Sequence, residues 1–416
     1  MIRGETIAAI ATAPGRGGVA IVRVSGPDAF AVGRVLTGRE MTPGRIRFAR
    51  IAGVDEGVVL AFAAPHSYTG EDVVEFQGHG GAVAPRRVLR AAIAAGARLA
   101  HRGEFTQRAF LNGRLGYDQA ESVLDLVDAK TERAAAAAFE GLQGRKERAL
   151  RALYEQALDL STEAEHTIDI DEGELPEGFV RDLQARIAAL DAALEGEIRR
   201  AAEGRILREG ALVVLAGPPN AGKSSLMNAL LGERRAIVSD VPGTTRDSIE
   251  EWLDVEGWPV RLVDTAGLRA TGDAIEREGV ERAEELIARA DLVLALGGGT
   301  VTGAARVLTV HAKCDLGRGE GLNVSAKTGE GLEDLRRAIA AELEAAAASA
   351  GEGAADDAAV AGLVEARTLL AGADAADLVL AANALRRVAE RLGALVGATY
   401  SSDLLDRLFS RFCVGK

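Results

Sequence analysis

Residues 211–231 read ALVVLAGPPNAGKSSLMNALL, an apolar run followed by a glycine-rich loop and a segment of good helix formers. Within it Gly217, Gly222, Lys223 and Ser224 complete the pattern G-x-x-x-x-G-K-S. A strand, a glycine loop and a helix in this order indicate a phosphate-binding loop. Glycine lets backbone N–H groups curl around phosphates, and the helix N-terminus carries partial positive charge. We therefore expect the lysine at the β- and γ-phosphates and the serine on Mg²⁺.

Two later segments extend this phosphate site. The segment 241–247, VPGTTRD, contains threonine hydroxyls where a second Mg²⁺ ligand belongs. The segment 260–268, VRLVDTAGL, is typical of a strand that ends in Asp264, with Gly267 placed to sense the γ-phosphate. Both segments supply groups for the γ-phosphate and its metal ion.

The base of the nucleotide is indicated by two more segments. LTVHAKCDL, residues 308–316, ends with Lys313 and Asp315, and NVSAKTG follows at 323–329. An aspartate in this loop accepts hydrogen bonds from N1 and N2 of guanine, so it selects GTP over ATP. Together with the phosphate loop, these segments predict a GTPase.

Two features depart from the usual pattern of such domains. Ala312 stands where an asparagine normally precedes the lysine. Loss of the asparagine side-chain amide should cost about 0.5–1.5 kcal/mol per hydrogen bond. The charge-assisted hydrogen bonds of Asp315 remain and contribute more, about 1.5–3 kcal/mol, so we expect guanine selectivity with weaker binding.

Only GGGTVTGAA, residues 297–305, separates two strand-like runs. Parallel strands usually need a longer crossover, so we expect a peripheral helix to be absent.

The residue after the D-x-x-G motif also differs from Ras-like switches, which place a water-orienting glutamine there. Leu268 occupies the position here and cannot orient water. The charged segment that follows offers Arg269, Glu276 and Glu281 instead. Without further information, an exposed, charged helix face is the favoured interpretation of each carboxylate.

Composition limits the class of protein. Among 416 residues, 49 Lys and Arg stand against 62 Asp and Glu, a net charge of -13, which argues against a protein that coats nucleic acid. Two cysteines fit a reducing cytoplasm, and the histidines and cysteines are too few and scattered for a Cys/His metal cluster. No run has the length of a membrane span and the N-terminus has no secretory layout, so we expect a cytoplasmic protein without membrane contact.

The character of the sequence changes along the chain, and four ranges follow. Residues 1–115 mix strand-like runs with glycine turns and predict a compact α+β domain, and 116–208 predict long helices. Residues 209–342 repeat strand, glycine loop and helix, which indicates a parallel α/β domain, and 343–416 are helical again. The fold class is therefore multidomain, an all-α domain interrupted by an inserted Ras-like α/β domain and preceded by the α+β domain.

The chain as a whole resembles the MnmE family, also called TrmE, of tRNA-modification GTPases. The resemblance rests on ATAPGRGGVAIVRVSG, YTGEDVVEFQGHGG, GEFTQRAFLNGRL, GPPNAGKSSLMNAL, VPGTTRD, DTAGLR and the terminal FCVGK, which occur in order between residues 11 and 416. It implies a tetrahydrofolate-binding-like first domain that mediates dimerisation, a helical domain and an inserted G domain.

The resemblance implies GTP hydrolysis stimulated by K⁺, which takes the place of an arginine finger. Asn220, Ser239, Val241 and Thr244 match the K⁺ ligands, Ser224 and Thr245 the Mg²⁺ ligands, and Glu276 the catalytic carboxylate. The implied GTP site comprises Asn220, Ala221, Gly222, Lys223, Ser224, Ser225, Ser239, Asp240, Val241, Pro242, Gly243, Thr244, Thr245, Asp264, Thr265, Ala266, Gly267, Lys313, Asp315, Ser325, Ala326 and Lys327.

A folate site and partners are also implied. Arg23, Glu75, Arg114 and Lys416 match the positions that bind 5-formyl- or 5,10-methylene-tetrahydrofolate. The family acts as a homodimer that forms a heterotetramer with the FAD-dependent protein MnmG. Together they install an aminomethyl or carboxymethylaminomethyl group at C5 of the wobble uridine of tRNA, using the folate one-carbon unit.

Two other functions remain open from the sequence. A ribosome-assembly GTPase of the Era or Der type shares the G-domain motifs, although this acidic chain lacks a basic KH-like G-x-x-G module. A folate enzyme with a purely regulatory GTPase is the second.

The terminal FCVGK raises a separate question. Cys413 lies fourth from the end, where a prenylation signal would place it, but Gly415 and Lys416 do not fit that signal. We expect a buried, packing thiol, since free cysteine is among the most buried residue types. The alternative is a direct chemical role in uridine modification.

Overall fold

The computed structural model describes residues 4–168, 175–235, 250–265, 283–298, 301–349, 358–396, 405 and 408–416. Contacts between residues divide the chain into two compact units. The first comprises Met1–Leu124, Gly141–Gly144 and Thr399–Lys416, and the second comprises Asp125–Glu140 and Arg145–Ala398. The four domain ranges expected from the sequence stay a prediction.

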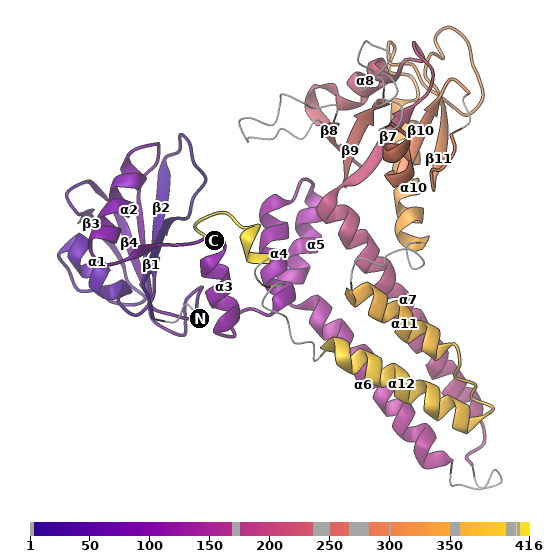
Figure 1. The fold of residues 1–416 in the computed structure, drawn as a ribbon, viewed down its shortest axis with the longest axis horizontal. Helices are drawn as coiled ribbons and strands as arrows, with labels where there is room; N and C mark the ends of the chain where they lie inside the picture. Colours follow the sequence, from indigo (N-terminus) through magenta and orange to yellow (C-terminus); the bar gives the residue numbers. More distant parts are fainter. Residues whose placement is uncertain are drawn as a thin grey trace. The chain divides into compact units, whose positions relative to one another are not determined.

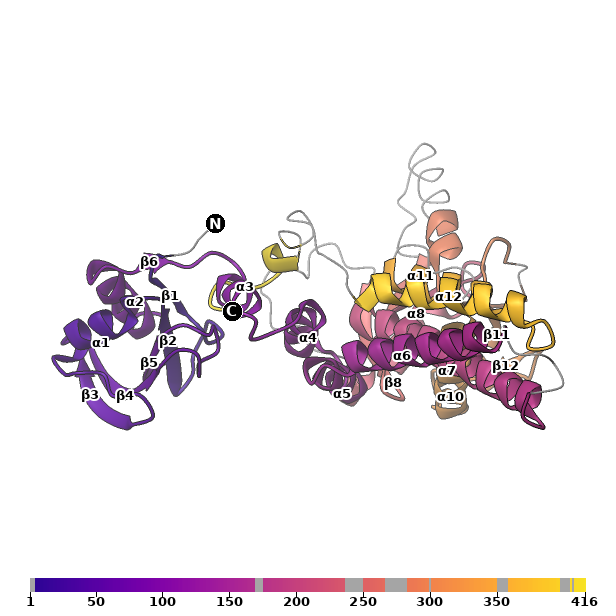
Figure 2. The same cartoon turned by 90° about the horizontal axis from the view of Figure 1, so that it is seen from below.

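A mixed sheet forms the body of the first unit (Figures 1 and 2). Its strand order is β3-β4-β5-β2-β1-β6. Neighbours are antiparallel except β1 and β6, which are parallel. The strands are β1 (Ile7–Ile10), β2 (Val19–Ser25), β3 (Ile46–Ile51), β4 (Asp55–Phe62), β5 (Val73–His79) and β6 (Arg98–Leu99).

Two helices, α1 (Ala29–Thr37) and α2 (Ala84–Ala94), cover one face of this sheet. The alternation of apolar side chains along the strands sends one set into the core beneath them. Val22, Val74 and Phe76 from the strands and Val88 from α2 are almost fully buried there. The helix α3 (Glu104–Leu111) follows the sheet, and α4 (Tyr117–Asp128) and α5 (Glu132–Leu142) each have residues in both units.

Long helices form the stem of the second unit. They are α6 (Arg145–Thr167), α7 (Phe179–Glu209), α11 (Ala358–Leu370) and α12 (Leu378–Val396). The last two follow the second sheet in the sequence, yet they pack on α6 and α7, which precede it, around leucines such as Leu153, Leu190 and Leu385. Among the described residues no helix has the length and apolar character that a membrane span requires.

A second sheet carries the phosphate-loop sequence. It runs β12-β11-β10-β7-β9-β8, and all neighbours are parallel except β8 and β9. Its strands are β7 (Ala211–Ala216), β8 (Glu250–Val255), β9 (Trp258–Asp264), β10 (Leu292–Leu296), β11 (Val307–His311) and β12 (Leu322–Asn323). The helices α8 (Lys223–Arg235) and α10 (Leu332–Ser349) accompany it, and the parallel sheet expected from the sequence is confirmed.

The short crossover between β10 and β11 is also confirmed. The two strands are parallel, and the described residues between them, 297–298 and 301–306, contain no helix. Val301 and Ala304 pack against the sheet cluster that contains Val214 and Val293. This segment thus supplies part of the apolar cover of that face.

Candidate functional site

The phosphate loop lies where the central strand β7 ends, between β9 and β10, the point at which the connections of the sheet change direction. Gly217 and Gly222 take φ values of +147° and +97°, and Asn220 takes +61°, a left-handed conformation that non-glycine residues adopt rarely. Lys223, the first residue of α8, is buried, and its Nζ donates to the carbonyls of Gly217 at 2.8 Å and Pro218 at 2.9 Å.

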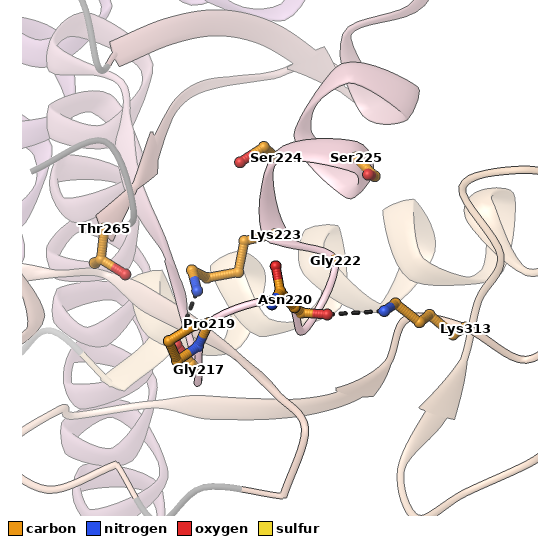
Figure 3. A pocket seen from close by; sticks show the side chains of 9 residues that line it. All are labelled: Gly217, Pro219, Asn220, Gly222, Lys223, Ser224, Ser225, Thr265 and Lys313. Atoms are coloured by element: carbon orange, nitrogen blue, oxygen red, sulfur yellow. Dashed lines mark hydrogen bonds between the residues drawn. The ribbon is translucent and has the colours of Figure 1, made fainter. Parts of the chain in front are cut away.

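An open pocket of about 480 Å³ lies over this loop (Figure 3). Side chains or backbone from the phosphate loop, from the end of β9 and from the loop after β11 line it. Those residues are Gly217, Pro219, Asn220, Gly222, Lys223, Ser224, Ser225, Thr265 and Lys313. The structure thus brings the predicted phosphate-binding residues together with a lysine of the predicted base loop.

Ser224 and Asp264 form the part of the site that suits Mg²⁺. The Ser224 hydroxyl donates to a carboxylate oxygen of Asp264 at 2.6 Å, and Asp264 is buried. A hydroxyl and a carboxylate are the hard oxygen donors that Mg²⁺ prefers. Thr265, in contrast, donates its hydroxyl to the Leu215 carbonyl at 2.8 Å, so this group is engaged with the sheet.

The predicted base loop is held by a second set of bonds. Lys313 and Ser325 form an antiparallel bridge, and the Ser325 hydroxyl donates to a carboxylate oxygen of Asp315 at 2.9 Å. Ser325 is fully buried, while Asp315 is exposed. The serine therefore fixes an exposed carboxylate, and Ala326 and Lys327 continue the same loop.

Ala312 lies against the phosphate loop. Its side chain is 8% exposed and belongs to the main core cluster of the sheet, and a Cβ placed on Gly222 would lie 3.5 Å from its methyl group. The next residue makes the polar link, since Lys313 donates from Nζ to the Asn220 carbonyl at 2.8 Å. Lys313 thus joins the predicted base loop to the phosphate loop, directly beside Ala312, which has no side-chain amide.

Part of the predicted nucleotide site lies outside the described residues. This applies to Ser239, Asp240, Val241, Pro242, Gly243, Thr244, Thr245, Ala266, Gly267 and Glu276. Their roles stay predictions.

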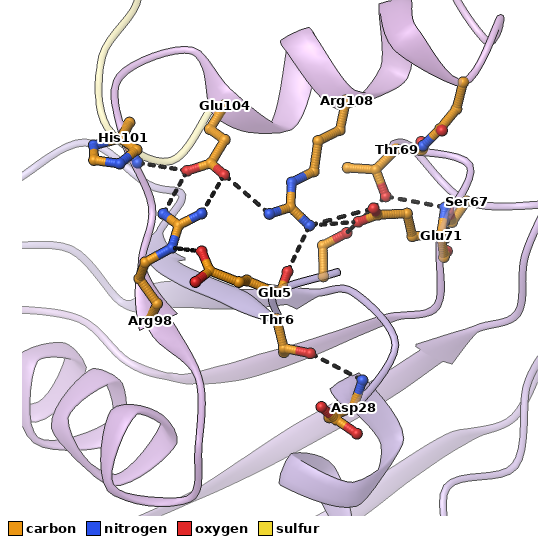
Figure 4. A network of polar contacts seen from close by, with 12 residues as sticks. Glu5, Thr6, Asp28, Ser67, Thr69, Glu71, Arg98, His101, Glu104 and Arg108 are labelled. Atoms are coloured by element: carbon orange, nitrogen blue, oxygen red, sulfur yellow. Dashed lines mark hydrogen bonds and ion pairs between the residues drawn. The ribbon is translucent and has the colours of Figure 1, made fainter. Parts of the chain in front are cut away.

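The first unit contains a buried ion-pair network (Figure 4). The carboxylate of Glu104 is fully buried and accepts hydrogen bonds from Arg98 at 2.7 and 2.9 Å, from Arg108 at 2.9 Å and from the backbone N–H of His101 at 2.8 Å. Burial alone would raise the pKa of Glu104, but these donors outweigh it and lower the pKa to about 2. Arg108 continues the network to Glu71 at 3.0 Å.

The predicted folate residues are distributed around the same region. Arg23 and Glu75 lie opposite each other on β2 and β5 and form an ion pair at 2.8 Å. The Arg23 guanidinium lies 5.1 Å from the ring centroid of Tyr68, and Arg114 donates to the carbonyl of Ser67 at 3.1 Å. Three of the four predicted residues therefore lie in one region: Arg23 and Glu75 on the strands β2 and β5, and Arg114 against the loop 67–70.

Sequence reasoning missed Tyr68 as part of this group. Its hydroxyl hydrogen-bonds to Thr106 at 2.8 Å, and burial raises its pKa. Phe105 flanks the same guanidinium, 5.6 Å from its ring centroid. The sequence feature that could have indicated it is the YTGED motif, which begins with Tyr68.

The C-terminal tail docks on the loop before α3. Val414 forms an antiparallel bridge with Arg102, and the Gly103 N–H donates to the Cys413 carbonyl at 3.4 Å. Gly415 has φ +110°, and a Cβ on it would collide with the backbone of Ile10 at the end of β1. Lys416, half-buried, follows directly, so the tail brings it to the sheet that carries Arg23.

The expectation of a buried thiol at Cys413 is wrong. Cys413 is exposed and unbridged, while Phe412 before it is only 1% exposed and packs with Phe409. The chain bends at Phe412, which lies in an apolar cluster with Phe409, and the next side chain, Cys413, lies at the surface.

Comparison with known proteins gives two family matches. The model described as the GTP-binding protein TrmE N-terminus matches residues 6–114, and the MnmE helical domain matches residues 118–413. Similar proteins include the tRNA modification GTPase MnmE of Ralstonia nicotianae, 43% identical over 100% of this chain and 97% of that protein. The protein of the same name from Symbiobacterium thermophilum is 45% identical over 99% of both chains. Among solved structures, the G domain of the T. maritima FeoB iron transporter covers 32% of this chain and 98% of its own, at 26% identity and a TM-score of 0.24.

Restoring the amide at position 312 should strengthen nucleotide binding. We expect Ala312→Asn to lower the Kd for GDP about two- to tenfold, which corresponds to one hydrogen bond of about 0.5–1.5 kcal/mol. Isothermal titration calorimetry measures this. Ala312→Leu is the control, because it adds volume without a hydrogen-bonding group and should weaken binding. An Asn variant that folds normally and binds GDP no better would contradict the explanation.

The charge of Glu104 should stabilise the first unit. Its folded pKa of about 2 lies below the ordinary 4.5, so the stabilisation is complete above about pH 4.5 and is lost as pH falls toward 2. We expect Glu104→Gln to destabilise this unit by about 3–5 kcal/mol near neutral pH. Hydrogen exchange of the α3 and β6 amides, corrected for intrinsic rates, reports it.

The matched control for this change is Glu40→Gln. Glu40 pairs with Arg34 at an exposed site, where both side chains are more than half accessible, so the loss should stay below about 1 kcal/mol. Equal protection of α3 in wild type and Glu104→Gln would refute the role of the buried charge.

Proposed function

Because the chain belongs to the MnmE family of tRNA modification GTPases, we propose that it binds and hydrolyses GTP during the modification of tRNA. One observation carries the proposal. The phosphate loop, Asp264 and the loop of Asp315 meet at the carboxyl edge of one parallel sheet, where Lys313 joins two of them at 2.8 Å. Open α/β sheets bind ligands at this edge.

The described residues divide the work on GTP. When GTP binds, the Lys223 ammonium group leaves the carbonyls of Gly217 and Pro218 and donates to the β- and γ-phosphates. Phosphate oxygens carry charge and are therefore the stronger acceptors. Ser224 holds Mg²⁺, and the carboxylate of Asp264 lies within hydrogen-bond distance of that hydroxyl. Asp315, fixed by Ser325, accepts the N1 and N2 hydrogens of guanine.

Potassium and the catalytic carboxylate complete the proposal. The side-chain oxygen of Asn220 is a suitable K⁺ ligand, and its left-handed backbone places this residue at the pocket. Ser239, Val241 and Thr244 are the other proposed K⁺ ligands, and Thr245 is the second Mg²⁺ ligand. A cation there supplies positive charge where negative charge develops during phosphoryl transfer. Glu276 is the proposed group that orients the attacking water.

The first unit is the proposed site for a tetrahydrofolate. Arg23, Arg114 and Lys416 offer positive charge for the glutamate tail, and Glu75 offers an acceptor for the pterin. The pair of Arg23 and Glu75 is mostly buried, with side chains 19% and 14% exposed. Tyr68 and Phe105 add aromatic surface beside it. The bound folate supplies the one-carbon unit, as its 5-formyl or 5,10-methylene form.

We further propose a homodimer that works with the flavoprotein MnmG in the cytoplasm to place an aminomethyl or carboxymethylaminomethyl group on the wobble uridine. The edge strand β3 supports self-association. Ile46 and Phe48 are 73% and 65% exposed there, on the face opposite to the core residues Ala49 and Ile51. Large exposed apolar side chains on a sheet edge favour contact with another chain.

The ion dependence of GTP hydrolysis tests the potassium mechanism. We expect replacement of K⁺ by Na⁺ to lower kcat by at least tenfold while the Kd for GDP changes little, because the cation acts on charge that develops in the transition state. Phosphate release at constant ionic strength measures the rate. Equal rates in the two salts would exclude the mechanism.

Nucleoside analysis of tRNA tests the function as a whole. In a strain that lacks this protein, we expect the C5-modified wobble uridine to disappear and the wild-type gene to restore it. The variant Glu276→Ala should bind GTP normally, hydrolyse it at least a hundredfold more slowly and fail to restore the nucleoside. Normal tRNA nucleosides with a ribosome-assembly defect would instead favour the Era- or Der-type function.

A further inference from the structure

The N-terminal part of the chain has the opposite charge balance to the whole. Residues 1–114 contain 15 arginines, no lysine and nine acidic residues, within a protein whose net charge is -13. An excess of positive charge confined to one part of an acidic protein indicates a local binding surface rather than general attraction to polyanions.

The acidic side chains of this part are mostly engaged. Glu75 pairs with Arg23, Asp55 with His79, and Glu71 with Arg108. Glu5 and Glu104 both pair with Arg98. Glu40 pairs with Arg34. Six of the nine carboxylates therefore take part in ion pairs inside the unit, and these pairs involve only four of the 15 arginines.

Three arginines on α2 form a surface of one sign, which we call the arginine face. Arg86, Arg87 and Arg90 are all exposed, whereas Val88 and Ala92 on the inner side of the helix are 3% and 0% exposed. The helix contains no acidic residue, and none of the three arginines forms an ion pair within the described residues. Like charges three and four residues apart slightly destabilise a helix, so helix stability does not account for them.

We propose that the arginine face binds the phosphate backbone of the tRNA on which the protein acts, an inference that rests on the proposed function. Guanidinium groups bind phosphate through two parallel N–H bonds, and residues three and four apart present them on one side of the helix. Such contacts fix the position of a nucleic acid without reading its sequence.

RNA suits this surface better than an acidic protein does. Protein interfaces centre on aromatic or aliphatic anchors that are removed from water on binding. Between Arg86 and Arg90 the helix exposes no such anchor, because Val88 is buried and Leu89 half-buried. The exposed aliphatic side chains nearby, Val83 and Ile93, lie beyond the two ends of the arginine face. Phosphate contacts require only cations, and the inner side of α2 keeps its packing when the arginines are changed.

The test compares two triple variants of the full chain. R86Q/R87Q/R90Q removes the arginine face, and R199Q/R386Q/R387Q removes the same charge from exposed positions on α7 and α12. Fluorescence anisotropy with labelled tRNA, between about 50 and 200 mM KCl, gives affinity and its salt dependence. For the first variant we expect at least about tenfold weaker binding at low salt and a log–log salt slope smaller by about one per arginine. The second should bind like wild type, and both should hydrolyse GTP normally.

Each other outcome overturns the inference. Unchanged tRNA binding by R86Q/R87Q/R90Q, or an equal loss in the second variant, would show that the arginine face has no specific part. Intact tRNA binding with weaker binding of MnmG would assign the face to a protein. Absence of tRNA binding by wild type, alone and with MnmG, would refute it as well. The nucleoside analysis is independent, so the proposed function can stand when the arginine face fails.

Discussion

A buried negative charge, that of Glu104, fixes the geometry on which the N-terminal unit depends. Burying a carboxylate away from water costs several kcal/mol of folding free energy unless opposite charges and hydrogen-bond donors surround it. Arg98 comes from β6, Arg108 from α3, and the His101 N–H from the loop between them, so the loop can take few other paths. The C-terminal tail docks on this same loop, so the bonds of Glu104 also hold the surface that Cys413 and Val414 contact.

The tail can reach its place because glycine stands at both points of close backbone approach. Gly103 has φ +65° and faces the backbone of Phe409, and Gly415 has φ +110° and faces Ile10. A side chain at either would have to displace backbone. The motif FCVGK then has distinct parts, namely an aromatic anchor at Phe412, a thiol that points outward and a lysine held at the sheet.

Local features could be predicted from the sequence, and distant pairings could not. The phosphate loop follows from the spacing of residues 217–224, and the absent helix between β10 and β11 follows from the length of the connection. The position of the tail that carries Cys413 depends on a bridge between Val414 and Arg102, which are more than 300 residues apart in the sequence, and the network of Glu104 joins Glu5 to Arg98. Nothing in the local pattern of these residues specifies their partners, because ion pairs and bridges across a fold depend on the complete topology.

The bond between Lys313 and Asn220 has a consequence for how the nucleotide site works. The carbonyl of Asn220 accepts the bond from the base loop, and the side chain of the same residue is the proposed potassium ligand. The carbonyl and the side chain belong to one residue, whose backbone is left-handed with φ +61°. Because Ala312 has no side-chain amide, Lys313 provides the polar link between the predicted base loop and the phosphate loop. The proposed potassium ligand is therefore the same residue that the predicted base loop holds through Lys313, so one hydrogen bond joins the two proposed parts of the site.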